Sequence, residues 1–491
     1  MMIAIRAMAC AVLGSLCMSG AALAAELVIR NDGPASASCH FQAPATSPVA
    51  MPDRAVAAGA TIHVLPPPGS LIDSVRCGGL TARAMRIGPA GPNGFLRLNG
   101  RQTRVLNVAL YPFIPSLPNG NFDRLIRHVV ARYQAENQDV LLHVVMSESV
   151  DIYDPETLAG LLSAGGYDVV ELDTLYLGFL AGKGLLAPMR VTGDAPLPAG
   201  RAAATHDHVL YGIPSWLCLD FAYADNPALA SARNLSDFVK ILSRHGRKSR
   251  GLSADFSGTT RLPSLYIDAY AQRYGTARLS DAMRMPPDDA VIDALATLVR
   301  ACDEGPRNVC ADGTLTRAPD GEIERAFATG RSMADIGFSE QSFYIALYAP
   351  KRAARPTMIP VPWGPHPAPL LYSDAFVTSR ASCGSGRCAE DGARFTALMT
   401  GIAMKNYIAF SGDLPAGAPP RHLLVATRPF WQQPRVRRDP IYRQAADAVA
   451  QGTAFPNALT QATRDRMARE VCLALKARVP VYDCGDTRGP M

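Results

Sequence analysis

The chain has 491 residues, of which 48% are hydrophobic and 19% are charged. This composition excludes a disordered or collagen-like chain, and the length suits roughly two to four packed units. The formal charge of +6 is small for this length and argues against a strongly basic nucleic-acid-binding protein. The 11 cysteines are the most informative feature of the composition.

Residues 1–24 match a secretory signal peptide, so we expect an exported protein. Arg6 supplies the positive start, residues 7–16 are apolar, and residues 22–24 (Ala-Leu-Ala) fit the rule for cleavage. The apolar run is too short for a membrane span, and no other stretch approaches the necessary length of about 18 residues. We therefore expect no membrane association after cleavage. The signal peptide does not distinguish the periplasm from the medium.

Cleavage would remove Cys10 and Cys17 and leave nine of the 11 cysteines. An oxidising compartment favours disulfides. Eight of these nine cysteines can pair with a near neighbour in the sequence: Cys39 with Cys77, Cys302 with Cys310, Cys383 with Cys388, and Cys472 with Cys484. Cys218 is left over. An odd cysteine in a secreted protein is an intermolecular linker, an inert buried thiol or a reactive thiol.

The segment of residues 25–104 differs in texture from the rest of the chain. Short alternating runs at residues 26–30, 61–65 and 94–98 are joined by stretches rich in Pro, Gly and Ser. This pattern predicts a small N-terminal β-rich module. A disulfide between Cys39 and Cys77 would staple a unit that is too small for a large core.

From residue 105 the pattern is typical of an α/β protein. Apolar strands at 105–110, 139–145 and 167–172 alternate with helical patterns at 122–137, 155–164 and 173–181. A strand near 209–213 precedes a second set of signals, and the end of the chain is helix-rich at 393–410, 441–451 and 460–478. We expect two α/β lobes, with lobe 1 at about 105–215 and 375–491 and lobe 2 at about 220–365. A ligand would bind between them, at the carboxyl ends of strands.

Cys218 lies at a strand junction that could face this cleft. A nucleophilic thiol needs a partner that takes its proton, whereas a free cysteine is also among the most frequently buried residue types. His206 and His208 lie in a polar stretch that is more typical of a solvated loop than of a metal site. The Cys383–Cys388 pair is better interpreted as a disulfide than as a zinc site. We expect neither a metal nor a cofactor.

Carboxylates and a tyrosine follow other predicted strands. Glu340 comes after an apolar approach and Asp173 ends a strand, while Tyr372 and Asp374 lie two apart and so share a strand face. Taken alone, each is more often structural. A carboxylate such as Glu340, for example, commonly begins a helix and interacts with its dipole.

In their order along the chain, these segments resemble the thiaminase I (thiamine pyridinylase) family, which are exported transferases with the fold of type II periplasmic solute-binding proteins. The resemblance covers about residues 105–480 and rests on six segments: 109–115, 167–173, 211–218, 258–260, 337–340 and 371–374. It implies that Cys218 is the nucleophile and Glu340 its base. It also implies a thiamine site lined by Tyr111, Asp173, Phe338, Tyr372 and Asp374. The family tends to have Tyr where this chain has Phe338, so a ring is kept and a hydroxyl is lost.

The activity implied by the resemblance is replacement of the thiazole of thiamine by an amine or other base, through a covalent Cys–pyrimidine intermediate. The partners would be thiamine and a small base of amine, pyridine or thiol type, and we expect a monomer that binds no nucleic acid. Two alternatives remain open. One is a non-catalytic exported solute-binding protein for thiamine or a similar cationic heterocycle, and the other is a thiol enzyme acting on another such heterocycle.

Overall fold

The computed structural model describes residues 26–484 with the exception of 45–49, 68–71, 88–93, 119, 121, 147–151, 165, 244–249, 257, 259–260, 303–307, 316–320, 351–355 and 367. The predicted signal peptide at residues 1–24 lies outside this described part. Over the residues described, the structure contains no helix that combines the length and the apolar character needed to cross a membrane.

A ten-stranded sheet forms the centre of the molecule, in the order β19-β13-β18-β10-β8-β9-β7-β1-β4, with β20 beside β18. From residue 104 onward it contains β8 (Arg104–Leu110), β9 (Val140–Met146), β10 (Val169–Asp173), β13 (Gly212–Cys218), β18 (Leu370–Thr378), β19 (Leu424–Val425) and β20 (Thr453–Ala454). The apolar strands β8, β9 and β10 are parallel, and β18 runs antiparallel to both β10 and β13. The helices that connect the parallel strands are α1 (Asp123–Glu136) and α2 (Pro155–Leu161). The predicted strand–helix alternation is therefore confirmed.

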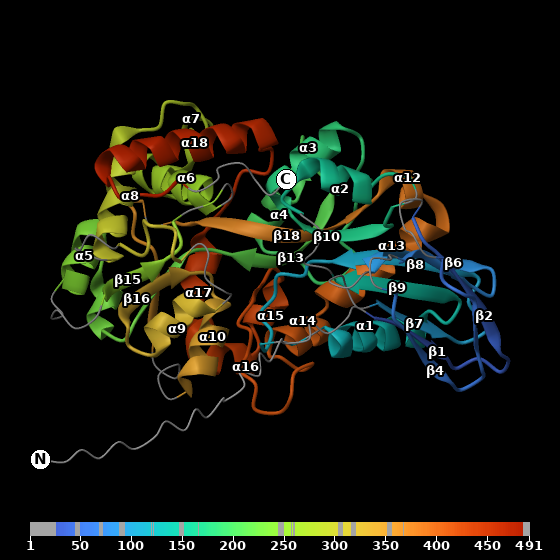
Figure 1. Cartoon of the computed structure of the whole chain (residues 1–491). Coiled ribbons are helices and arrows are strands. Elements are labelled where there is room, and N and C mark those ends of the chain that lie inside the picture. Colours follow the sequence, from blue (N-terminus) through green and yellow to red (C-terminus); the bar gives the residue numbers. More distant parts are fainter. Residues whose placement is uncertain are drawn as a thin grey trace, which may run out of the picture.

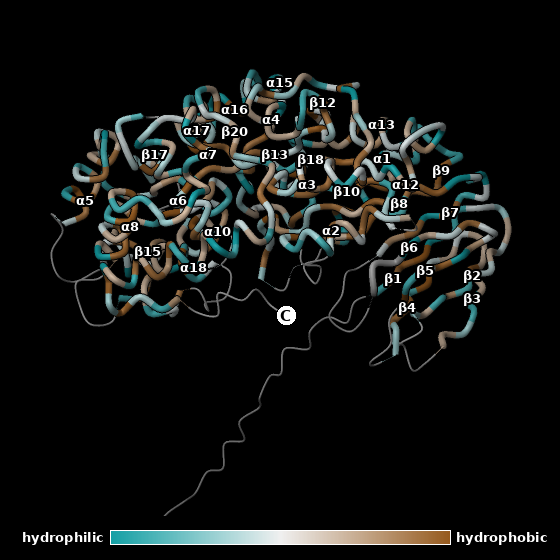
Figure 2. The backbone as a smooth tube through the Cα atoms, turned by 90° about the horizontal axis from the view of Figure 1, so that it is seen from above, coloured by the Kyte–Doolittle hydropathy of each residue, from teal (hydrophilic) through white to brown (hydrophobic). Residues whose placement is uncertain are grey.

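The N-terminal strands divide between two sheets. The central sheet is extended by β1 (Leu27–Asn31), β4 (Thr61–Val64) and β7 (Gly94–Leu98). A separate four-stranded sheet contains β2 (Ala37–Gln42), β3 (Arg54–Val56), β5 (Ile72–Cys77) and β6 (Leu80–Ile87). Buried apolar side chains, including Ile29, Val75 and Leu141, form the core of this region. Both views place these strands at the end of the molecule opposite α5 and β15 (Figures 1 and 2).

The N-terminal segment of residues 25–104 is therefore joined to the rest of the chain by hydrogen bonds between strands. β7 pairs antiparallel with β9, so the predicted module shares a sheet with the lobe that follows it. The physical reason is that β9 would otherwise be an open sheet edge with unpaired backbone groups, which β7 covers.

The second lobe is built on a four-stranded sheet in the order β15-β16-β14-β17. Its strands are β14 (Phe221–Ala224), β15 (Arg250–Ala254), β16 (Ser332–Gly337) and β17 (Thr357–Pro360). Its helices are α5 (Leu235–Ser243), α6 (Arg261–Tyr274), α7 (Leu279–Ala282), α8 (Asp289–Cys302), α9 (Glu322–Ala328) and α10 (Gln341–Tyr348). The chain enters this lobe through Leu219 and Asp220, between β13 and β14, and leaves it between β17 and β18.

The last helix, α18 (Gln461–Arg478), returns to this second lobe. It packs against α6 and α8 at the end of the molecule far from the N-terminal strands (Figure 1). We had expected the whole segment from 375 to 491 in lobe 1, and this expectation is corrected for α18. Its buried residues Met467, Val471 and Leu475 join the core that contains the apolar side chains of α6 and α8, which fixes its place.

Most of the remaining elements surround the first lobe. They are β11 (Thr205–His206), β12 (Val209–Leu210), α3 (Leu177–Gly182), α4 (Pro198–Ala203), α12 (Arg380–Cys383), α13 (Gly386–Thr400), α14 (Ile402–Ala409), α15 (Arg428–Trp431), α16 (Pro434–Arg438), α17 (Pro440–Gln451) and the short 3-10 helix Thr174–Tyr176. Two further 3-10 helices belong to the second lobe: Pro227–Ser231, which contacts α5 and β17, and Thr276–Arg278, which contacts α6 and α7. The predicted helix at 393–410 is two helices, because the chain at Gly401 is extended (φ −67°, ψ 148°).

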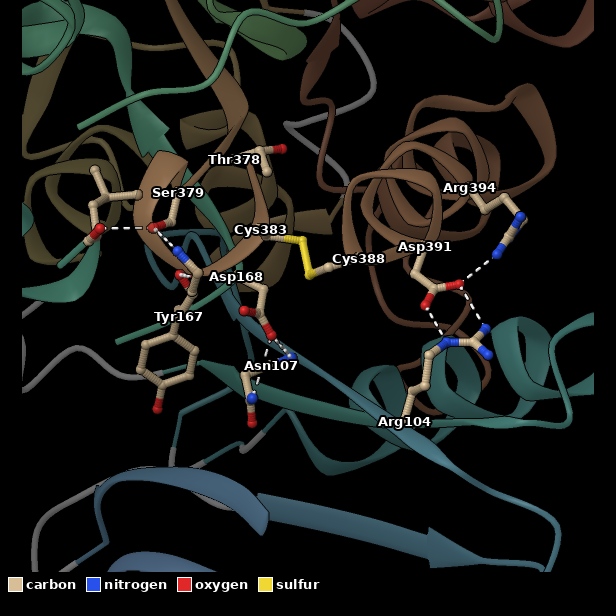
Figure 3. The surroundings of a disulfide bond; sticks show 12 residues. Arg104, Asn107, Tyr167, Asp168, Thr378, Ser379, Cys383, Cys388, Asp391 and Arg394 are labelled. Atoms are coloured by element: carbon tan, nitrogen blue, oxygen red, sulfur yellow. Dashed lines mark hydrogen bonds and ion pairs between the residues drawn. A yellow bond between two sulfur atoms is a disulfide. The ribbon is translucent and has the colours of Figure 1, made fainter. Parts of the chain in front are cut away.

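Four disulfides confirm the pairing predicted from cysteine spacing: Cys39–Cys77, Cys302–Cys310, Cys383–Cys388 and Cys472–Cys484. Among the described cysteines, Cys218 alone is free. Figure 3 shows Cys383–Cys388 beside Asp168, whose carboxylate accepts hydrogen bonds from Asn107. These three residues lie close enough to share a metal ion, but the two sulfurs are bonded to each other and offer no thiolate ligand. The interpretation of this pair as a disulfide is confirmed.

Candidate functional site

One face of the central sheet gathers most of the residues singled out in the sequence. In the antiparallel pair of β13 and β18, Cys218 lies opposite Tyr372 and Trp216 lies opposite Asp374. On the other side of β18, Asp173 lies opposite the same Asp374. Directly opposed residues of neighbouring strands project from the same face. Cys218, Tyr372, Asp374 and Asp173 therefore form one contiguous group, contributed by three strands that are distant in the sequence.

Cys218 occupies the point where the chain passes from one lobe to the other. It is the last residue of β13 and is partly buried. Burial raises the pKa of its thiol well above the usual value, and the negative charges of Glu340, Asp374 and Asp173 raise it further. The thiol is therefore protonated at neutral pH, and it needs a base before it can act as a nucleophile.

Glu340 reaches this group from the second lobe. It follows β16 and is the residue before α10, and its charge acts on both Cys218 and Asp374. Ser339 Oγ donates a hydrogen bond of 3.3 Å to its carboxylate. Burial raises the pKa of Glu340 to about 7. A carboxylate with such a pKa suits a general base at neutral pH.

Asp173 and Asp374 make the group strongly acidic. Asp374 is only 4% exposed, and its pKa is raised well above the usual value by burial and by the neighbouring carboxylates of Asp173, Glu171 and Glu340. Burial also raises the pKa of Asp173 to about 6, although its Oδ1 accepts a hydrogen bond of 2.9 Å from the backbone N–H of Leu175. A cationic ligand would relieve the repulsion between these carboxylates.

Aromatic rings border the group on two sides. The Tyr111 hydroxyl lies 3.0 Å from the Tyr153 hydroxyl. The Tyr372 ring packs at 4.6 Å from the Phe455 ring and at 5.9 Å, edge to face, from the Phe338 ring. Such faces can hold a flat heterocycle. All seven predicted site residues thus belong to one neighbourhood: the charges of Cys218 and Asp374 reach Tyr111, and Phe338 contacts Tyr372.

Several neighbours were not singled out from the sequence. Asp220 forms an ion pair of 2.5 Å with Arg261, whose guanidinium lies 4.7 Å over the Phe338 ring. Asp220 could have been singled out from the sequence as a site residue, because it lies only two residues after Cys218. Lys405 and Glu171 are buried beneath the acidic group and gave no such signal, because a single charge in an apolar run is usually at the surface.

No protein-family model and no curated protein matches the sequence. Solved structures do share the fold. Thiaminase I from Bacillus thiaminolyticus has a TM-score of 0.60 and 22% identity, and the match covers 76% of this chain and 99% of that one. Clostridium botulinum thiaminase I in complex with thiamin has a TM-score of 0.60 and 16% identity, covering 76% and 100%. Maltose-bound MalE3 of T. maritima has a TM-score of 0.58 and 12% identity, covering 78% and 97%.

At these identities the comparison establishes the fold and leaves open the choice between catalysis and binding. The four disulfides and this fold point to an exported protein. The chain has the two-lobe α/β fold of type II periplasmic binding proteins, which thiaminase I and MalE3 share.

Proposed function

We propose that the protein is a thiamine-degrading transferase of the thiaminase I type, which exchanges the thiazole of thiamine for an amine or another small base. The observation that supports this proposal is that the charge of Glu340, which follows a strand of the second lobe, acts on the thiol of Cys218 in the first. Among the described cysteines this is the thiol left outside disulfides, and Glu340 is the carboxylate whose charge affects it most. A protein that only binds a solute needs neither group.

The acidic and aromatic surroundings fit thiamine as the ligand. Its thiazolium ring is a permanent cation, and Asp173 with Asp374 would attract it or bond the amino group of the pyrimidine. The rings of Tyr111, Tyr372 and Phe338 would hold the flat pyrimidine. In support, a structural neighbour was solved in complex with thiamin.

The proposed reaction has two steps. Glu340 takes the proton of Cys218, and the thiolate adds to the pyrimidine carbon beside the bridging methylene. The C–N bond to the thiazole breaks, and the neutral thiazole leaves with that electron pair. The incoming base then bonds to the methylene, and the bond between Cys218 and the pyrimidine breaks with its electron pair on sulfur. The released Cys218 thiolate takes back the proton held by Glu340, and the surplus proton of an amine or thiol base then passes to Glu340 or to solvent.

The raised pKa of Cys218 is consistent with this order of events. Without ligand, burial and then the charges of the surrounding carboxylates keep the thiol protonated and therefore unreactive. A bound cation offsets those negative charges and lowers the pKa of the thiol, so that Glu340 can deprotonate it. The nucleophile would thus form only when substrate is present.

A Cys218→Ser variant tests the proposal. It should still bind thiamine, by calorimetry, but should release no thiazole when aniline or pyridine is added. Turnover by this variant at the normal rate would refute the mechanism. Thiamine binding by the wild-type protein with no thiazole release under any base would favour the second candidate, a solute-binding protein, which the likeness to MalE3 supports. We further propose that residues 1–24 direct export and that the mature chain acts as a monomer.

A further inference from the structure

A single lysine lies buried against the face of the sheet that carries the acidic group. Lys405 belongs to α14 and has no solvent exposure. Its ammonium lies 3.4 Å from the centre of the Trp216 ring and 5.9 Å from the centre of the Phe376 ring. Within the described part of the chain, its Nζ has no hydrogen-bond partner. A buried ammonium without hydrogen bonds is costly, so its retention calls for a compensating interaction.

The strand register identifies that interaction. Trp216 lies directly opposite Asp374, and Phe376 follows Asp374 by two residues on the same face of β18. The ammonium over the Trp216 ring therefore lies on the face of the sheet that carries Asp374. Burial lowers the pKa of Lys405 to about 7, and the charges of Glu171 and Asp374 oppose this shift by favouring the ammonium form. Glu171 lies opposite Phe376, and its Oε2 accepts a hydrogen bond of 3.2 Å from the backbone N–H of Tyr111.

We propose that Lys405 is the internal counter-ion of the site, a positioning residue that favours the ionised form of Asp374 and so the binding of a cationic substrate. This inference rests on the proposed function for the identity of the cation, but its electrostatic part does not. Three carboxylates, Glu171, Asp173 and Asp374, share one buried face with this one ammonium. Burial and the neighbouring carboxylates raise the pKa of Asp374, and Lys405 opposes this shift, so without Lys405 the ionised form of Asp374 would be less favoured.

The titration of Asp374 depends on groups from every element around it. Those that face it are Glu171 and Asp173 from β10, Cys218 from β13, Glu340 from the turn before α10, Lys405 from α14, and Tyr111 and Tyr153 from the segments after β8 and before α2. Lys405 is the cation in this set, and the acids oppose the ionisation of Asp374. Removal of Lys405 must therefore raise the pH at which Asp374 ionises.

The test compares Lys405→Met and Lys405→Gln, which remove the charge, with Lys405→Arg, which keeps it. Trp216 contacts Lys405 and lies opposite Asp374 in the strand pair, so its fluorescence should report their ionisation in the ligand-free protein. The component of the pH titration that disappears in Asp374→Asn belongs to Asp374. We expect its midpoint to rise by at least about one pH unit in the Met and Gln variants and to stay near the wild-type value in the Arg variant.

Ligand binding provides the second readout. In a Cys218→Ser background at pH 7, Lys405→Met should bind thiamine about tenfold more weakly for each pH unit of that shift, and the affinity should recover at alkaline pH. Lys183→Met, at an exposed lysine paired with Glu156, is the matched control and should change neither readout.

The outcomes separate this inference from the proposed function. An unchanged Asp374 midpoint in the Met and Gln variants overturns the role of Lys405, whatever thiamine does. If the Asp374 midpoint shifts in the Met and Gln variants while the Cys218→Ser protein binds no thiamine, the result supports Lys405 as the counter-ion and refutes thiamine as the substrate. Loss of affinity that is equal at all pH values would indicate a merely structural lysine and would also overturn the inference.

Discussion

Replacing Glu340 with Gln should make the protein more stable at alkaline pH while it abolishes activity. Burial raises the pKa of Glu340 from its ordinary 4.5 to about 7 in the folded protein. Below pH 4.5 both folded and unfolded states are protonated here, so the group has no effect on relative stability. Between the two pKa values the folded state binds more protons, and stability is lost as the pH rises through 7.

The size of this effect follows from the two pKa values. A difference of about 2.5 units corresponds to at most about 3 kcal/mol of unfolding free energy, and less to the extent that water reaches the partly buried carboxylate. Gln has nearly the same shape and no charge. The variant should therefore exceed the wild type in stability by up to about 3 kcal/mol at pH 8 and by little at pH 5.

Urea unfolding at these two pH values measures the difference, with thiazole release measured in parallel. Loss of a general base should reduce turnover by about 10²–10⁴-fold. Glu322→Gln is the control, because this surface carboxylate is paired with Arg325 and Arg331 and its replacement should not stabilise the protein. A Glu340→Gln variant that is no more stable than the wild type at pH 8, or that keeps full activity, refutes the reasoning.

Three further predictions concern other parts of the chain. Phe338→Ala loses two aromatic contacts and should lower kcat/KM about tenfold, whereas Phe338→Tyr keeps them and should stay near the wild-type value by steady-state kinetics. Burial lowers the pKa of His143 from 6.5 to about 4, so stability should fall by up to about 3 kcal/mol as the pH drops from 6.5 to 4. Thermal melts of His143→Leu should lack this loss, unlike those of the exposed control His40→Leu. Replacing Cys472 and Cys484 together by Ser should cost about 2–4 kcal/mol in urea unfolding, and an unchanged midpoint would show that this disulfide is dispensable.

Much of the fold was predictable because its signals are local. The apolar runs at 105–110 and 139–145 became β8 and β9 within one residue of the predicted bounds. The disulfides followed from spacing, since cysteines such as Cys383 and Cys388 have a sequence separation of only 5 and lie in the consecutive helices α12 and α13. Patterns of this kind can be recognised from neighbouring residues in the sequence, without knowing which distant segments come into contact.

The errors concern which surface an element meets. The sequence of β7 predicts a strand, but it does not predict which strand β7 pairs with. The pairing of β7 with β9 is made by backbone groups, and these are the same in any sequence. The apolar stripe of α18 likewise predicts a helix that must be buried and does not say against which lobe. Such contacts are decided by the whole chain.

The candidate site shows the same division. Its seven predicted residues came from a resemblance in motif order, and the strand register accounts for their meeting at Asp374. Lys405 escaped prediction because an isolated lysine in a mostly apolar helix normally extends to solvent. Only the packing of α14 on Trp216 shows that its charge points inward.

The most direct measurement is the mass of the protein after incubation with thiamine in the absence of an added base. The account predicts a covalent adduct of pyrimidine size on the peptide that contains Cys218, which disappears when aniline is added. An unmodified Cys218 peptide under conditions in which thiazole is still released would contradict the account at its centre.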